Sequence, residues 1–115
     1  MTSKKIFYLL ATVAMAFVLI ACERTKIGDI NADPGLFMNK EVAVAGRVTQ
    51  SVGLLGKGIY QIDDGTGSLW VFANVRGVPS RGATVGVKGH VIPTLTFLGV
   101  NYATVIRESD RRRAD

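Results

Sequence analysis

The chain has little of what metal sites, disulfide frameworks and nucleophilic catalytic sites are built from. Of its 115 residues, one is a cysteine (Cys22) and one is a histidine (His90). A single cysteine excludes an intrachain disulfide and any zinc site with two thiolate ligands. His90 has no spaced acid or second histidine that would make a metal site or a nucleophile–base pair. We therefore expect no metal, no cofactor and no catalytic residues.

A long apolar stretch occurs once, at Ile6–Ile20. Its 15 residues are fewer than the roughly 20 that span a bilayer as a helix. Lys4 and Lys5 precede the stretch and Ala21 follows it, which is the anatomy of a secretory signal peptide. An uncleaved anchor helix with an incidental thiol is the alternative interpretation.

The residues that end this stretch, Leu19-Ile20-Ala21-Cys22, resemble the lipobox of bacterial lipoproteins. The resemblance implies that residues 1–21 are a signal peptide cut before Cys22, and that the Cys22 thiol is acylated and holds the protein on a membrane. Several acyl chains make such attachment durable, since one chain gives only marginal binding. In Gram-negative members, an aspartate after the cysteine favours retention at the inner membrane. Glu23 stands here, which favours the periplasmic side of the outer membrane.

Cleavage would leave 94 residues, enough for one small domain. That part carries 12 basic and 9 acidic residues, a net charge of +3, and three of the cations are Arg111-Arg112-Arg113 near its end. The remaining part is nearly balanced, which argues against nucleic acid as the main partner. All 13 glycines lie after the signal, between short runs rich in valine and isoleucine, and this pattern predicts an all-β domain.

The pattern along the chain divides it into a tether at residues 22–28, a domain at residues 29–108 and a charged, disordered tail at residues 109–115. A short helix is predicted at Asp33–Asn39, with Asp33 as its cap and Pro34 in its first turn. A glycine-flanked loop is expected at 53–58, a hairpin turn at 64–67 and a loop containing Pro93 at 92–97. Five strands are predicted, at 41–50, 59–63, 68–74, 85–91 and 98–107.

Alternation within these strands predicts which side chains fill the interior. On the first strand Val42, Val44 and Val48 share one face with Gly46, where a glycine permits a bend or bulge. On the third strand Leu69 and Val71 lie opposite Trp70 and Phe72. Val44 and Val71 are expected to be core residues, and Val42, Val48, Leu69 and Ala73 share their strand faces. Tyr60 and Ile62 lie on one face of the second strand, and Val85, Val87 and Val91 lie on one face of the fourth.

Three segments resemble the sequence blocks of OB-fold domains, including the anticodon-binding type and small envelope proteins. They are Val42–Val48, Tyr60–Val71 and Gly82–Val91. The resemblance covers Ile30 to Arg107 and implies a five-stranded barrel that follows the short amino-terminal helix. The helix that often lies between the third and fourth strands has almost no room here, so the Asp33–Asn39 helix is expected to close the barrel.

The third strand also supplies the candidate binding residues. Trp70 and Phe72 are expected on the outer surface of the second and third strands, where OB-folds bind ligands and where rings can stack on bases or sugars. Cover by the helix or loops is the alternative. Arg47, Lys57 and Lys88 are candidates for the rim of that surface, and scattered surface cations are the alternative.

Other motifs have simpler interpretations. Asp63 and Asp64 are adjacent on a strand and cannot act as a catalytic pair, and Asp64 before Gly65 is a turn former. The arginine triplet fits either a solvated tail or contact with lipid phosphates. The sequence therefore predicts a lipid-anchored envelope module, not an enzyme, that binds a protein, glycan or other oligomer. A nucleic-acid-binding protein is the alternative.

Overall fold

The structure is a computed structural model that describes residues 24–74 and 76–113. The predicted signal peptide, Cys22 and the last two residues lie outside this part. No helix in the described ranges is long and apolar enough to cross a membrane.

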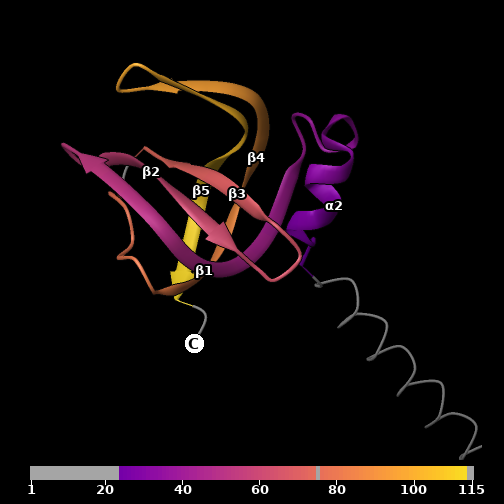
Figure 1. The fold of residues 1–115 in the computed structure, drawn as a ribbon, viewed down its shortest axis with the longest axis horizontal. Coiled ribbons are helices and arrows are strands. Elements are labelled where there is room, and N and C mark those ends of the chain that lie inside the picture. Colours follow the sequence, from indigo (N-terminus) through magenta and orange to yellow (C-terminus); the bar gives the residue numbers. More distant parts are fainter. Residues whose placement is uncertain (1–23, 75, 114–115) are drawn as a thin grey trace, which may run out of the picture.

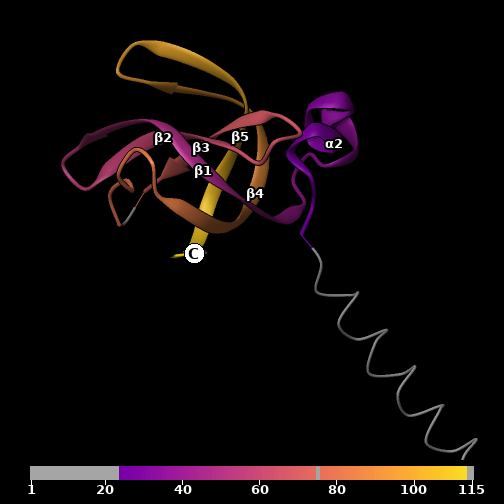
Figure 2. The same ribbon diagram turned by 60° about the horizontal axis from the view of Figure 1, so that its bottom comes forward.

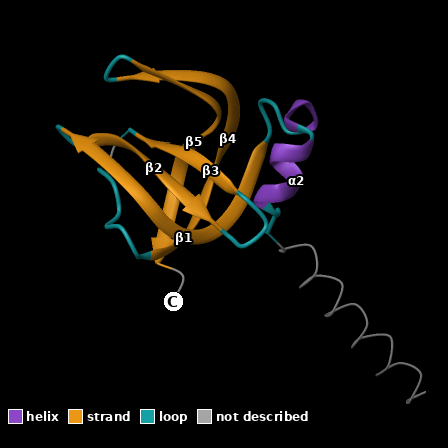
Figure 3. Ribbon diagram, in the orientation of Figure 1, coloured by secondary structure: helices purple, strands orange, loops and turns teal. Residues whose placement is uncertain are grey.

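Five strands form a closed barrel in the order β1-β2-β3-β5-β4, which confirms the predicted all-β architecture and is consistent with an OB-fold (Figures 1 and 3). Neighbouring strands are antiparallel except β3 and β5, which are parallel. The strands are β1 Glu41–Leu54, β2 Lys57–Asp63, β3 Ser68–Ala73, β4 Thr84–Phe97 and β5 Val100–Arg113.

The predicted alternation is confirmed by burial. On β3, Leu69, Val71 and Ala73 are buried, whereas Trp70 and Phe72 between them are half-exposed. Val44 and Val71, the predicted core residues, are buried members of one apolar cluster. The cluster also holds the residues on the same strand faces and Tyr60, Ile62, Val85, Val87 and Val91. Burial of this kind gives roughly 25 cal/mol per Å² of apolar surface removed from water, so these residues stabilise the barrel.

Strand β1 is strongly curved and serves two neighbours (Figure 1). It pairs with β4 from Glu41 to Arg47 and with β2 from Arg47 to Leu54. Gly46 lies at this change of partner, and a Cβ there would stand 2.6 Å from the carbonyl oxygen of Asp63. Glycine is therefore needed for the close approach of β2. The bulge itself lies at Thr49, between Val48 and Gln50, three residues beyond Gly46.

The amino-terminal helix begins earlier than predicted. Helix α2 spans Ile27–Ala32, and Pro34–Leu36 form a 3₁₀ turn, η1, in which Asp33 makes no side-chain cap. Ile27 and Ile30, one helical turn apart, are fully buried in the barrel cluster. Residues 27 and 28 thus belong to the folded domain, not to the tether. Helix α2 supplies buried contacts to the barrel, and Phe37 and Met38 of the segment predicted to close it are partly buried against the same cluster.

Strands β4 and β5 are longer than predicted, because the segment assigned to a loop pairs with β5 and the segment assigned to a tail pairs with β4. Residues 92–97 continue β4 and pair with β5 residues 100–105, so the expected loop is the arm of a hairpin. Residues 109–113, predicted as a disordered tail, continue β5, and Arg113 pairs with Val85. Backbone hydrogen bonds do not depend on side-chain type, so the arginines of β5 can pair with the apolar strand β4.

Candidate ligand-binding face

The outward side of β2, β3 and β5 carries the predicted aromatic pair. Paired strand residues point to the same side of a sheet, so the register places Gln61 beside Trp70 and Ile59 beside Phe72. Across the β3–β5 pairing, Val105 lies beside Trp70 and Arg107 beside Phe72. We call this surface the outer face; its residues are Ile59, Gln61, Trp70, Phe72, Val105 and Arg107.

The hairpin formed by β4 and β5 packs on the outer face. The ring of Tyr102 lies edge-on to Trp70 with centroids 4.9 Å apart, and the ring of Phe97 meets Phe72 in the same manner at 6.1 Å. Edge-to-face pairs at such distances contribute about 0.5–1.5 kcal/mol beyond area burial. The rings thus lie outside the barrel, as predicted, and are also partly covered by a neighbouring segment.

Ile59 and Val105 show that this packing is a second apolar cluster. Both side chains are fully buried, yet neither belongs to the cluster inside the barrel. Their partners in the register are Phe72 and Trp70, so the aromatic layer shields them from solvent. The outer face therefore has a buried apolar floor with half-exposed rings above it.

Two hairpins border the outer face, and their tips are apolar. Leu55 and Gly56 make the two-residue turn between β1 and β2, both with positive φ, and Leu98 and Gly99 make the corresponding turn between β4 and β5. Both views place these tips on the side of the molecule away from α2 (Figures 1 and 2). Within the described ranges, six large apolar residues are exposed, and five of them lie on these hairpins: Val52, Leu54, Leu55, Leu98 and Val100.

The three cations that were predicted at the rim of the aromatic surface do not lie together in the structure. Lys57 lies on the β1–β2 hairpin, next to the outer face. Arg47 instead lines a shallow depression with Arg81, and Lys88 lines another with arginines of β5. Arg107 was not singled out from the sequence, although it lies at the rim beside Phe72 and is exposed. Its place depends on the parallel β3–β5 register, for which the sequence holds no local signal.

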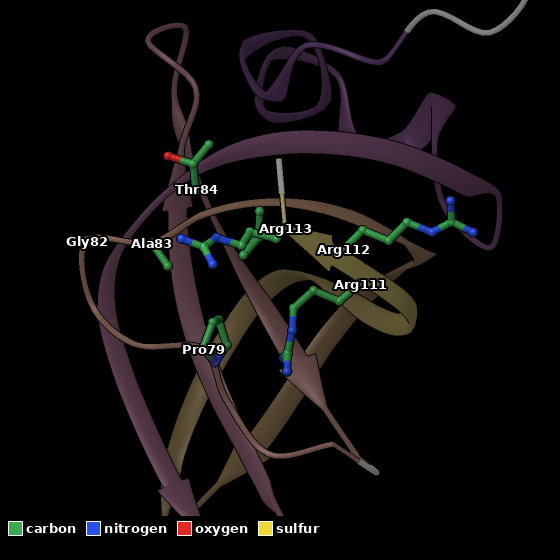
Figure 4. A pocket seen from close by; sticks show the side chains of 8 residues that line it. Pro79, Gly82, Ala83, Thr84, Arg111, Arg112 and Arg113 are labelled. Atoms are coloured by element: carbon green, nitrogen blue, oxygen red, sulfur yellow. The ribbon is translucent and has the colours of Figure 1, made fainter. Parts of the chain in front are cut away.

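The arginine triplet occupies the end of the barrel near the β3–β4 connection. Arg111 and Arg113 turn toward an open depression of about 430 Å³ beside Pro79 and Gly82, whereas Arg112 turns to the other side (Figure 4). Strand alternation explains this, because Arg111 and Arg113 pair with the inward residues Val87 and Val85.

Arg111 belongs to a network inside the barrel. The Tyr60 hydroxyl donates a hydrogen bond to the Glu108 carboxylate at 2.5 Å, and Arg111 lies 3.2 Å from the same carboxylate and over the Tyr60 ring. Arg111 also donates to the carbonyl of Gly77, which ties the β3–β4 connection to β5. Burial, together with Glu108, raises the pKa of Tyr60 far above its usual value. These groups are engaged in structural contacts.

The two adjacent aspartates form the β2–β3 turn, as predicted. Asp63 accepts from the Gly65 N–H, and Asp64 accepts from the N–H groups of Thr66 and Ile27, so the turn also holds the start of α2. Burial raises the pKa of Asp64, but these hydrogen bonds outweigh it and leave the pKa below its usual value. Within the described ranges, no group of three or more potential metal ligands occurs.

Comparison with known proteins supports the fold. No protein-family model matches the chain, and no curated protein sequence matches it. A Leishmania major Friedlin protein assigned as an aspartyl-tRNA synthetase superposes on 80% of the chain with a TM-score of 0.60 and 16% identity. The OBody AM3L09, solved with hen egg-white lysozyme, superposes on 77% with a TM-score of 0.56 and 21% identity. The chain spans 21% of the synthetase and 92% of the OBody, and these likenesses show the fold.

Proposed function

We propose that the protein is a lipid-anchored binding module of the bacterial cell envelope whose outer face and two bordering hairpins hold a protein, glycan or other oligomeric ligand. The membrane attachment rests on the lipobox resemblance at Leu19–Cys22, outside the described residues. With Glu23 after the cysteine, the proposed location is the periplasmic side of the outer membrane in a Gram-negative cell.

The observation that carries the proposal is the apolar character of both hairpin tips. Exposed apolar groups are normal singly but mark interaction sites when they gather around one surface. Leu55 is 92% exposed and Leu98 is 58% exposed, although both occupy positive-φ turn positions where glycine or asparagine is usual. Local folding gives no reason for leucine there, whereas contact with a partner does. Of the proposed ligands, this favours a protein.

Two further features support a protein ligand. The OBody barrel was solved bound to a protein, lysozyme, so a barrel of this fold holds such a ligand. The cations Arg47 and Lys88 lie in separate depressions away from the rings, so of the three predicted rim cations only Lys57 lies next to the outer face. An enzymatic role is not part of the proposal, because Tyr60 and Asp64, whose pKa values are shifted, are engaged in structural hydrogen bonds.

Site-specific photo-crosslinking in cells tests the proposal. A photoreactive residue placed at Leu55 or at Leu98 should give the same adduct, since both tips border one face. Leu36 is the matched control, because it is also an exposed leucine (60%) but lies on η1. Adducts of equal yield at all three positions, or none at the two hairpin tips, would contradict the proposal.

A nucleic-acid ligand is the second candidate, favoured by the likeness to the synthetase and by Arg107 beside Phe72. Single-stranded nucleic acid gives a slope of log affinity against log salt of about −0.7 per neutralised phosphate, so Lys57 and Arg107 together predict about −1.4. Oligonucleotide binding followed by the fluorescence of Trp70 measures this slope. Trp70→Ala should bind more weakly whether the ligand is a protein or a nucleic acid, because the ring contact is lost. A loss of folding instead would assign the ring a structural role.

A further inference from the structure

A basic depression lies on the outward side of β1, β4 and β5, apart from the outer face. It has a volume of about 320 Å³, and the cationic side chains that turn to this side are those of Arg24, Lys88 and Arg112; Arg113 also lines it, although its side chain turns toward the depression beside Pro79. Asp110 is the acidic residue among those that line it. We call this surface the basic depression.

Small residues make its floor. Ala43 and Gly86 line it, and the register sets Ala43 beside Lys88 and Gly86 beside Arg112. A Cβ added at Gly86 would meet no atom within 4 Å, so the space above it is open. The hollow is therefore a consequence of short side chains between long cationic ones, and a phosphate group can approach the backbone of β4 there.

The positive charge of the basic depression is only partly neutralised. Asp110 lies 3.5 Å from Arg112 and 3.4 Å from Arg76, so its single carboxylate is shared. Within residues 24–74 and 76–113, the side chains of Arg24 and Lys88 make no ion pair or hydrogen bond. A surface of this composition attracts anions.

Arg24 is held in this place by the fold. The neighbouring Thr25 donates its backbone N–H to the carbonyl of Ala43 at 2.8 Å, which fixes the start of the described chain along β1. Arg24 is two residues from Cys22. The basic depression is thus the part of the domain beside which the chain arrives from the proposed acylation site.

We propose that the basic depression docks on the anionic phosphate headgroups of the membrane that holds the protein. This rests on the proposed lipid attachment, because a chain acylated at Cys22 keeps Arg24 within reach of the headgroups. No lining residue of the depression is aromatic, so it lacks the stacking groups that single-stranded nucleic acid uses. The two hairpin tips lie on the side of the molecule away from α2 (Figures 1 and 2). Arg24 lies three residues before that helix, so docking through Arg24 leaves both tips free of the lipid surface.

The test compares two lysines of the same chain. The purified full protein is reconstituted in vesicles of phosphatidylcholine alone or of phosphatidylcholine and phosphatidylglycerol, and acetylation rates are measured at each lysine by mass spectrometry. Lys88 and Lys57 are both exposed strand residues, and Lys57 lies on the β1–β2 hairpin. At a ratio of about 7:3, phosphatidylglycerol should slow acetylation of Lys88 about fivefold, the factor for one charge at an anionic surface, and leave Lys57 unchanged.

A variant and two controls separate the outcomes. Arg112→Gln should reduce the protection of Lys88, and high salt should abolish most of it. Equal rates for Lys88 in both vesicles would overturn the proposal, as would equal protection of Lys57. Protection by glycerol 3-phosphate without anionic lipid would assign the depression to a soluble anion and also overturn it.

The Cys22→Ser chain distinguishes the two proposals. Protection of Lys88 that persists in this chain, together with an absence of acyl label in the wild type, would contradict the lipid attachment and leave the headgroup contact standing. An acyl label on Cys22 with no protection of Lys88 would contradict the headgroup contact alone.

Discussion

Replacing Tyr60 with phenylalanine removes one hydroxyl group from inside the barrel. Tyr60 is fully buried, and its hydroxyl donates to a Glu108 carboxylate whose side chain is only 5% exposed. A hydrogen bond to a charged group contributes about 1.5–3 kcal/mol, and the variant leaves the carboxylate with Arg111 as its remaining side-chain partner. We expect the free energy of unfolding to fall by about 2 kcal/mol. For a domain of this size that lowers Tm by roughly 8–16 °C.

Tyr102→Phe is the matched control, because the Tyr102 hydroxyl has no hydrogen bond within the described ranges and its ring contact with Trp70 is kept. Its unfolding free energy should change by less than about 0.5 kcal/mol. Urea and thermal unfolding followed by far-UV circular dichroism measure both variants. Equal stability of Tyr60→Phe and Tyr102→Phe would refute the network as a stabilising element.

The same hydroxyl predicts a dependence on alkaline pH. Because burial and Glu108 raise the pKa of Tyr60 in the folded protein, the hydroxyl stays protonated there while the unfolded chain ionises near pH 10. The unfolded state then binds fewer protons than the folded state, so stability is full below about pH 10 and falls as pH rises above it. In Tyr60→Phe the free energy of unfolding should fall less steeply above about pH 10 than in the wild type. An unchanged dependence on alkaline pH would assign the effect to other groups.

Three further outcomes are expected. Cys22→Ser should abolish acyl labelling and release the protein from the membrane fraction, and unchanged labelling would contradict the lipid attachment. Val71→Asp should unfold the domain, since an unpaired buried charge costs more than about 4 kcal/mol, whereas Val52→Asp on the exposed hairpin should fold and bind less well. The hydrogen bond from the Ile27 N–H lowers the pKa of Asp64, so the stability that this carboxylate contributes is present above about pH 4 and is lost as pH falls through the folded pKa. In Asp64→Asn the free energy of unfolding should therefore fall less steeply at acid pH. The same dependence of unfolding free energy on acid pH in the wild type and in Asp64→Asn would refute this role of Asp64.

The barrel interior could be predicted from the sequence because apolar residues recur at every second position along its strands. Val42, Val44 and Val48 follow it, and so does the Leu69–Ala73 run, because each of these side chains must leave water. The turn at Asp64–Gly67 was equally accessible, since its aspartates and glycines have specific roles in a tight turn.

The segments that were missed have no such signal. Residues 92–97 pair with β5 outside the barrel, and several of their side chains are exposed. Pro93 usually interrupts a strand, but here it lies within β4, opposite Thr104, which has a positive φ. Helix α2 begins at Ile27, and its N-cap residue Lys26 makes no side-chain cap, so the sequence holds no capping signal for its start. The composition of the outer face depends on the parallel β3–β5 register, which only the closed barrel defines.

That parallel register also determines where the barrel is weakest. Strands β3 and β5 join over three residue pairs, whereas β4 and β5 join over twelve. Opening the short seam converts the barrel into an open sheet without breaking the longer ladders, so amide hydrogens of β3 that face β5 should exchange faster than those of the β4–β5 ladder. Trp70 and Phe72 stand on this seam, and a ligand that bridges them to β5 binds only the closed form. Occupancy of the outer face and closure of the barrel are therefore one linked equilibrium, in which each favours the other.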